Sequence, residues 1–289
     1  MNLIEQTKEK LSELEKIGKN SEYIKELSNL ALLQIENDDF EASKNNLLIC
    51  LKHFKKQHDR LGQAAVYGLL GTLYFKTELY EESIKNYEYA KDIYKELNQT
   101  GELITCLKGI GNSLIKVNRL DEASDAFFKC TAICSDHNDL YNFLDCVGNL
   151  ITIYEGLDDW DVVYELYQKS LDAFSKLKDY KGMIVTNFNL GIIKRNNGEY
   201  DDALIFFKNG TNIAIDSNFA EYIVKGLSYV AECLFYQGKM NESKKQYLQA
   251  LNVAQKVKMD NAIIQLRLLL NSFGLNDNEI EKELENLRS

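Results

Sequence analysis

The residues whose types and spacing best suit chemistry lie in the segment CTAICSDH, residues 130–137. Cys130, Cys134 and His137 carry thiol and imidazole groups, which are ligands that zinc prefers. A structural zinc site needs four converging ligands, whereas this segment offers three. A free cysteine inside a helix also packs as a small hydrophobic residue. The sequence therefore favours packing for both cysteines and predicts no metal and no cofactor.

The other reactive side chains do not form a recognisable catalytic set. None of His53, His58 and His137 is spaced from a serine and an acid as a triad would require. Acidic pairs such as Asp158–Asp159 and Asp201–Asp202 stand at predicted helix starts, where carboxylates favour the helix dipole. Glycine-bearing runs such as GLLG lie inside helical patterns and do not follow a strand, as a phosphate loop would. A helical hydrolase or transferase is thus disfavoured, and we expect a protein that is not an enzyme.

The composition narrows the class of partner and the compartment. The net charge of −10 argues against nucleic acid, because phosphates repel an acidic surface. No apolar stretch approaches the length of a membrane span, and the start MNLIEQTKEK lacks the apolar region of a signal peptide. The six cysteines follow no secreted-domain framework. A cytoplasmic location is the expectation, with no membrane contact.

The elements that must position any site emerge when the chain is written in rows of 40 residues, which align without a gap. The rows start at Ile24, Ala64, Ile104, Leu144, Ile184 and Val224. A small residue recurs at the eighth position of most rows, as in Gly71 and Gly111. An aromatic residue or leucine recurs at the twenty-fourth, as in Tyr87 and Phe127. Small residues let two helices approach closely, and the larger side chain fills the space between them.

Each row also carries a turn signal. The fifteenth position holds Asp38, Glu78, Asn118, Asp158, Gly198 and Gly238. Most of these residue types tolerate the left-handed conformation that ends a helix. Each row is therefore predicted to contain a helix A, a tight turn, a helix B and a polar connection to the next row. Trp160 stands at a recurring apolar position just after the turn and is predicted to lie in the core.

The rows resemble the tetratricopeptide repeat over about residues 24–263. The segment YGLLGTLY with Ser83, Tyr87 and Ala90 fits that signature best, and NFNLGIIK with Ala203 and Phe207 follows. The proline that usually closes helix B is absent, and the period is 40 residues where about 34 is usual. Longer rows of this kind are similar to those of kinesin light chains, Pins-type spindle scaffolds and bacterial peptide-sensing regulators.

The resemblance implies an all-α, right-handed α-solenoid of six helix-turn-helix repeats with capping helices at both ends. The repeats are expected at 24–63, 64–103, 104–143, 144–183, 184–223 and 224–263. An amphipathic helix over 3–17 predicts an N-terminal cap within residues 1–23. A seventh helix A over 261–273 and a short final helix predict a C-terminal cap within 264–289.

The resemblance also implies that helix A lines a concave groove in which a peptide binds. The candidate peptide-binding residues are Lys108, Asn112, Asn149, Thr152, Asn189 and Arg195. Lys108, Asn112 and Asn149 match the first three residues of the family's clamp for acidic C-termini. Val185 and Asn189 stand where that clamp has two basic residues, so a complete carboxylate clamp is not expected. An Asn amide can instead pair with the N–H and C=O of an extended peptide.

These observations predict a protein–protein interaction scaffold or adaptor that holds an extended peptide segment in its groove. Lys108 and Arg195 would favour acidic side chains or a carboxylate. The alternative is a structural subunit of a larger assembly, which binds through its convex face or its ends. The expected partner is a protein or peptide, and the chain itself is expected to be a monomer or a weak homodimer.

Overall fold

The computed structural model describes residues 3–18 and 20–288, which form fifteen α-helices and no strand. The predicted all-α class is therefore confirmed for this part of the chain. Residues 1, 2 and 19 of the expected N-terminal segment, and residue 289 of the expected C-terminal segment, lie outside the described residues. None of the helices in the described part has the length and apolarity that crossing a bilayer requires.

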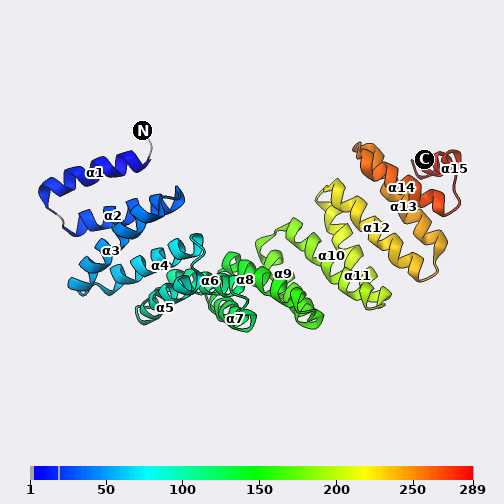
Figure 1. Ribbon diagram of the computed structural model, residues 1–289. Helices are drawn as coiled ribbons and strands as arrows, with labels where there is room; N and C mark the ends of the chain where they lie inside the picture. The colour runs from blue at the N-terminus through cyan, green and yellow to red at the C-terminus, as the bar shows by residue number, and fades with distance from the viewer. Residues whose placement is uncertain (1–2, 19, 289) are drawn as a thin grey trace. The chain divides into compact units, whose positions relative to one another are not determined.

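The chain divides into two compact units, Met1–Ile153 and Tyr154–Ser289, and each is described by itself. The division falls within helix α8, which is labelled in Figure 1. The helices up to this point are α1 (Leu3–Ile17), α2 (Ser21–Glu36), α3 (Phe40–Lys56), α4 (Arg60–Lys76), α5 (Tyr80–Glu96), α6 (Thr100–Lys116), α7 (Leu120–Asp136) and α8 (Leu140–Gly156). The helices beyond it are α9 (Trp160–Leu177), α10 (Tyr180–Asn196), α11 (Tyr200–Asp216), α12 (Ala220–Tyr236), α13 (Met240–Lys256), α14 (Asp260–Ser272) and α15 (Asp277–Arg288).

The same turn ends helices A and helices B alike. A residue with positive φ occurs every 20 residues from Asp38 to Lys258, so the connection from B to A repeats the turn from A to B. After α4, the Glu78 N–H bonds to the Phe75 carbonyl at 3.1 Å, and the Leu79 N–H bonds to the Tyr74 carbonyl at 2.9 Å. These two bonds satisfy helix-terminal carbonyls in the pattern of a Schellman motif. The sequence indicated the first set of turns and missed the second.

Helices A and B of a row pack through the small and aromatic positions that the sequence indicated. Phe127 of α7 is fully buried, and a Cβ atom built on Gly111 of α6 would lie 2.7 Å from its ring. A buried serine adds a polar link, because the Ser83 hydroxyl donates to the Gly71 carbonyl at 2.8 Å. Ser43 makes the same bond to the Ala31 carbonyl at 2.8 Å. Close approach of the two helices is thus fixed by both shape and hydrogen bonding.

The prediction that Trp160 lies in the core is wrong, since its side chain is 44% exposed. Equivalent aromatic residues find ring partners, as Tyr80 does with Phe75 and Tyr200 with Tyr236. The positions equivalent to those partners hold Glu155 in the row of Trp160 and Asn196 in the next row. Without an apolar partner at either position, the indole ring gains little by turning inward.

Candidate functional site

Helices A form one side of each unit and lie close to one another. In the first unit α2 packs against α4 and α4 against α6, and in the second α10 packs against α12. Among the described residues within a unit, consecutive helices B make no comparable contact, apart from α13 and α15 near the end. The helix-A side is therefore the narrower, inner face of each unit. The helices B spread apart on the other face.

The six predicted peptide-binding residues lie on helices A. Lys108 and Asn112 are on α6, Asn149 and Thr152 on α8, and Asn189 and Arg195 on α10. All are half-buried except Thr152, which is exposed. The first four belong to the first unit, and the last two belong to the second. The structure thus brings Lys108, Asn112, Asn149 and Thr152 into one unit.

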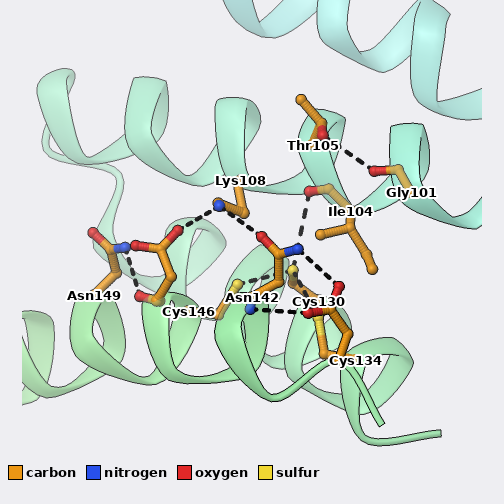
Figure 2. A network of polar contacts seen from close by, with 11 residues as sticks. Gly101, Ile104, Thr105, Lys108, Cys130, Cys134, Asn142, Cys146 and Asn149 are labelled. Carbon is orange, nitrogen blue, oxygen red and sulfur yellow. Dashed lines mark hydrogen bonds and ion pairs between the residues drawn. The ribbon is translucent and has the colours of Figure 1, made fainter. Parts of the chain in front are cut away.

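Lys108 is already engaged by the next helix A (Figure 2). Its ammonium group donates to the Asn142 Oδ1 atom at 2.9 Å and forms an ion pair with Asp145, both on α8. Burial lowers the pKa of Lys108, but the hydrogen bond and charge of Asp145 outweigh it, so the pKa is raised. A partner carboxylate would therefore compete with Asp145 for this charge.

Arg195 repeats this arrangement in the second unit. Its guanidinium group forms an ion pair with Glu232 on α12, the next helix A. The same group lies 5.9 Å from the centre of the Tyr229 ring. Both candidate cations are thus neutralised by an acid one row further on, which the sequence analysis did not foresee. The sequence signal was present, because Asp145 and Glu232 also occupy helix-A positions that face the groove.

The amide side chains keep unused hydrogen-bonding capacity. The Asn149 Nδ2 atom donates to the Asp145 carbonyl of its own helix at 3.0 Å, and the Thr152 hydroxyl donates to the Gly148 carbonyl at 3.1 Å. Burial raises the pKa of Tyr167 to about 12, and the nearby Asn189 side chain acts in the opposite direction. Asn112 makes no side-chain hydrogen bond with any described residue. Since an amide offers two donor hydrogens and an acceptor oxygen, these residues can pair with a peptide backbone.

The cysteines predicted to pack are buried. Cys130 and Cys134 are fully inaccessible, and their sulfur atoms lie 4.0 Å apart. Cys146 of α8 joins them, with its Sγ atom 2.8 Å from that of Cys130 (Figure 2). Burial raises the pKa of the Cys134 thiol to about 12, so the thiolate that a metal requires is disfavoured.

His137 is exposed at the end of α7, where its Nδ1 atom lies 2.9 Å from the Ile133 carbonyl oxygen. Within the described residues, no group of three or more His, Cys, Asp and Glu side chains could hold a metal ion.

The outer face carries two clefts that the sequence analysis did not find. The first-unit cleft lies between α5 and α7, with α6 as its floor, and has a volume of about 390 Å³. The second-unit cleft lies between α9 and α11, with α10 as its floor, and has a volume of about 680 Å³. Both follow from the spreading of the helices B, which uncovers part of the helix A between them.

Comparison with known proteins agrees with this geometry. The model of the tetratricopeptide repeat matches residues 64–97, which include most of α4 and all of α5. No curated protein matches the sequence.

Two solved structures share the fold over most of the chain. The apo form of RapI is 18% identical, with a TM-score of 0.54 over 82% of this chain and 99% of that chain. A signal transduction ATPase with numerous domains and a tetratricopeptide repeat sensor, PH0952 from Pyrococcus horikoshii, is 13% identical. Its TM-score is 0.52 over 98% of this chain and 46% of that chain. Residues 64–97 thus match a tetratricopeptide repeat, and the rows around this repeat show the same helical-hairpin pattern.

Proposed function

We propose that this protein is a non-enzymatic interaction module that binds an extended segment of a partner protein along the inner face of its helices A. Tetratricopeptide-like arrays present extended inner surfaces suited to such binding. The observation that carries the proposal is the pair Asn112 and Asn149. They lie on the A helices of consecutive rows, in one unit, with amide groups that the fold does not fully use.

The spacing of the rows suits an extended chain. Packed helices are separated by about 8–10 Å, which is close to three residues of extended peptide at about 3.3 Å each. Asn112 and Asn149 could therefore meet the backbone of one strand at two points. Thr152 and Lys108 would add contacts beside them. Asn189 and Arg195 offer the same kinds of side chain on α10 of the second unit.

The ion pairs of Lys108 and Arg195 limit how much an acidic partner segment can gain from these two charges. A segment that presents an acidic side chain must displace Asp145 from Lys108 or Glu232 from Arg195, so the net gain from charge is small. Backbone pairing by Asn is then the main source of affinity. The partner is a protein or peptide, and we place the complex in the cytoplasm without cofactor, nucleic acid or membrane.

The test begins with capture of the partner from native lysate and mapping of its bound segment as synthetic peptides. Calorimetric titration then compares the wild type with the double variant Asn112→Ala/Asn149→Ala and with Asn189→Ala. We expect the double variant to abolish binding of peptides that bind the first unit, and Asn189→Ala to weaken binding only of peptides that bind the second unit. The melting temperature should hardly change, because polar surface substitutions usually alter stability by less than about 0.5 kcal/mol.

Two controls make the outcome specific to the inner face. Asn241→Ala, at an exposed position of the outer helix α13, should leave the affinity unchanged. Lys108→Ala should weaken binding, and more so at low salt, because a charge contribution is screened. An unchanged affinity in the double Asn variant would remove the inner face from the mechanism. It would favour the alternative, a structural subunit that binds through its outer face or its ends.

A further inference from the structure

The second-unit cleft differs chemically from its counterpart in the first unit. The two clefts are built largely from equivalent positions two rows apart: nine of the twelve residues that line the first have their equivalent, 80 positions later, in the lining of the second. Lys91, Lys95 and Lys129 line the first cleft together with three acidic residues. Their equivalents in the second are Leu171, Ser175 and Asn209. The substitutions remove every lysine of the first cleft.

The charge that remains in the second cleft is negative. The twelve residues lining it include Asp172 and Asp216 but no Lys, Arg or His. Asp172 is paired with Lys176 at 2.6 Å, whereas Asp216 has no ion pair with any described residue. Gln168, Asn209 and Asn212 add exposed amide groups around the rim. The rim therefore offers acceptor oxygens and one uncompensated carboxylate.

The floor of the second cleft contains a polar residue where the other rows are apolar. Asn187 is only 3% exposed and occupies the position held by Leu27, Tyr67, Leu107, Val147 and Leu227. Its Nδ2 atom donates to the Met183 carbonyl of its own helix at 2.8 Å. Its Oδ1 atom accepts no hydrogen bond from a described residue, yet it is not fully covered. This oxygen therefore faces the cleft without a donor.

Packing alone would favour an apolar side chain at this position, whereas Asn187 keeps an acceptor oxygen open to the cleft. A donor supplied by a ligand would satisfy it. Leu171, Met183 and Ile213 line the same cleft and provide apolar contact for an alkyl chain. A long side chain with a cationic, donor-rich end matches this combination of apolar walls, amide oxygens and carboxylate.

We propose that this cleft binds an arginine side chain presented by a segment of a partner protein. The aliphatic part of the side chain lies against the apolar walls, and the guanidinium group donates to the Asn187 Oδ1 atom and to Asp216. Arginine suits the site better than lysine, because its planar fork donates in several directions at once. The site is separate from the proposed groove on the helices A, so it adds a second point of attachment on the outer face.

The experiment titrates the full chain with blocked peptides and measures affinity by calorimetry and by the NMR signals of the Asn187 side-chain amide. The probes are acetyl-Ala-Ala-Arg-Ala-Ala-amide, the same peptide with neutral citrulline in place of arginine, and arginine amide. We expect the arginine peptide to bind and to shift the Asn187 signals. Citrulline should lower the affinity at least about tenfold, since hydrogen bonds to a charged group are the stronger ones.

Two variants locate the site. Asn187→Leu introduces the residue that three other rows carry, so it should fold well, and it should weaken binding of the arginine peptide at least about tenfold. Asp216→Asn, at an exposed position, should weaken binding of the arginine peptide severalfold and make this binding less dependent on salt. Two controls should leave the affinity for the arginine peptide unchanged: Lys129→Ala in the first-unit cleft, and the double variant Asn112→Ala/Asn149→Ala in the groove. If the double variant loses peptide binding in the groove, its affinity for the arginine peptide should therefore still equal that of the wild type.

Several outcomes would overturn the proposal. Failure of the arginine peptide to bind the wild type would leave the cleft without its ligand. Equal affinity for the citrulline peptide would exclude recognition of the cation. Unchanged binding in Asn187→Leu would place the peptide elsewhere. Arginine amide binding as tightly as the peptide would show that the cleft takes a free cation and not a protein segment.

Discussion

Two glycines of α4, three residues apart, should respond in opposite ways to replacement by alanine. A Cβ atom on Gly68 would have no atom within 4 Å, whereas a Cβ on Gly71 would lie 2.8 Å from the ring of Tyr87. That ring cannot move freely, because Gly109 of α6 also lies against it, and a Cβ atom added there would be 2.5 Å from the ring. Tyr87 is only 8% exposed, and its hydroxyl lies 2.9 Å from that of Thr72.

The magnitudes follow from two effects. Replacing glycine by alanine inside a helix stabilises it by about 1 kcal/mol, and this term is common to both variants. Overpacking a buried contact costs about 1–3 kcal/mol, and this term applies only to Gly71→Ala. Gly68→Ala should therefore raise the free energy of unfolding by about 1 kcal/mol. Gly71→Ala should leave it unchanged or lower it by up to about 2 kcal/mol.

Urea denaturation followed by circular dichroism measures both variants against the wild type. Because the helix-propensity term cancels in the difference between them, that difference isolates the contact with Tyr87. A third variant, Gly71→Ala/Tyr87→Leu, introduces the combination Ala31 and Leu47 of the first row and should recover part of the loss. Equal stabilisation by Gly68→Ala and Gly71→Ala would refute the close helix contact on which the packing argument rests.

Three further predictions concern stability. Phe127→Ala should lower the free energy of unfolding by about 3–5 kcal/mol in chemical denaturation, because the ring is fully buried; the partly exposed Phe128→Ala should cost clearly less. Lys178→Gly should raise the free energy of unfolding by about 1 kcal/mol, because Lys178 ends α9 with a φ of 56°, a conformation that glycine adopts more easily. Gly198→Ala should lower the free energy of unfolding in the same assay. Stability should fall as pH rises from about 9 to 12, because burial raises the pKa of Cys106 from 9.0 to about 12 and that of Tyr94 from 10.0 to about 12. In the unfolded chain these groups lose their protons first, so urea midpoints measured at increasing pH should decline, and Cys106→Ala should flatten the decline.

The repeating core could be predicted from sequence because each contact is repeated in several rows. A small residue such as Gly111 and a ring such as Phe127 recur at fixed distances, and their shapes require one another. The second set of turns escaped prediction although Asn98, Asn138 and Asn218 are typical of the left-handed conformation, because Lys178 and Lys258 at the equivalent positions are not. Their conformation is imposed by the helices on either side. The prediction that Trp160 is buried failed for a related reason, since burial at this position depends on apolar partners that Trp160 lacks.

The candidate site was predictable in its residue types but not in its charge balance. Helix periodicity placed Lys108 and Asn112 on α6 correctly, because one helical face follows directly from spacing. The pairing of Lys108 with Asp145 depends on the side-chain conformations of two helices, which spacing within one helix does not fix. Asn187 could have been found by comparing the rows, because it is the one amide at a position that is otherwise apolar.

Each helix packs mainly against its neighbours in sequence, and this has a consequence for how the chain folds. Contacts between residues close in sequence require little loop closure before they form, so such topologies fold quickly. Among the described residues of each unit, no pairing couples distant rows, so unfolding can start at the weakest junction between rows while other rows persist. Amide hydrogens should consequently exchange with solvent at graded rates along each unit, with protection set by the local row.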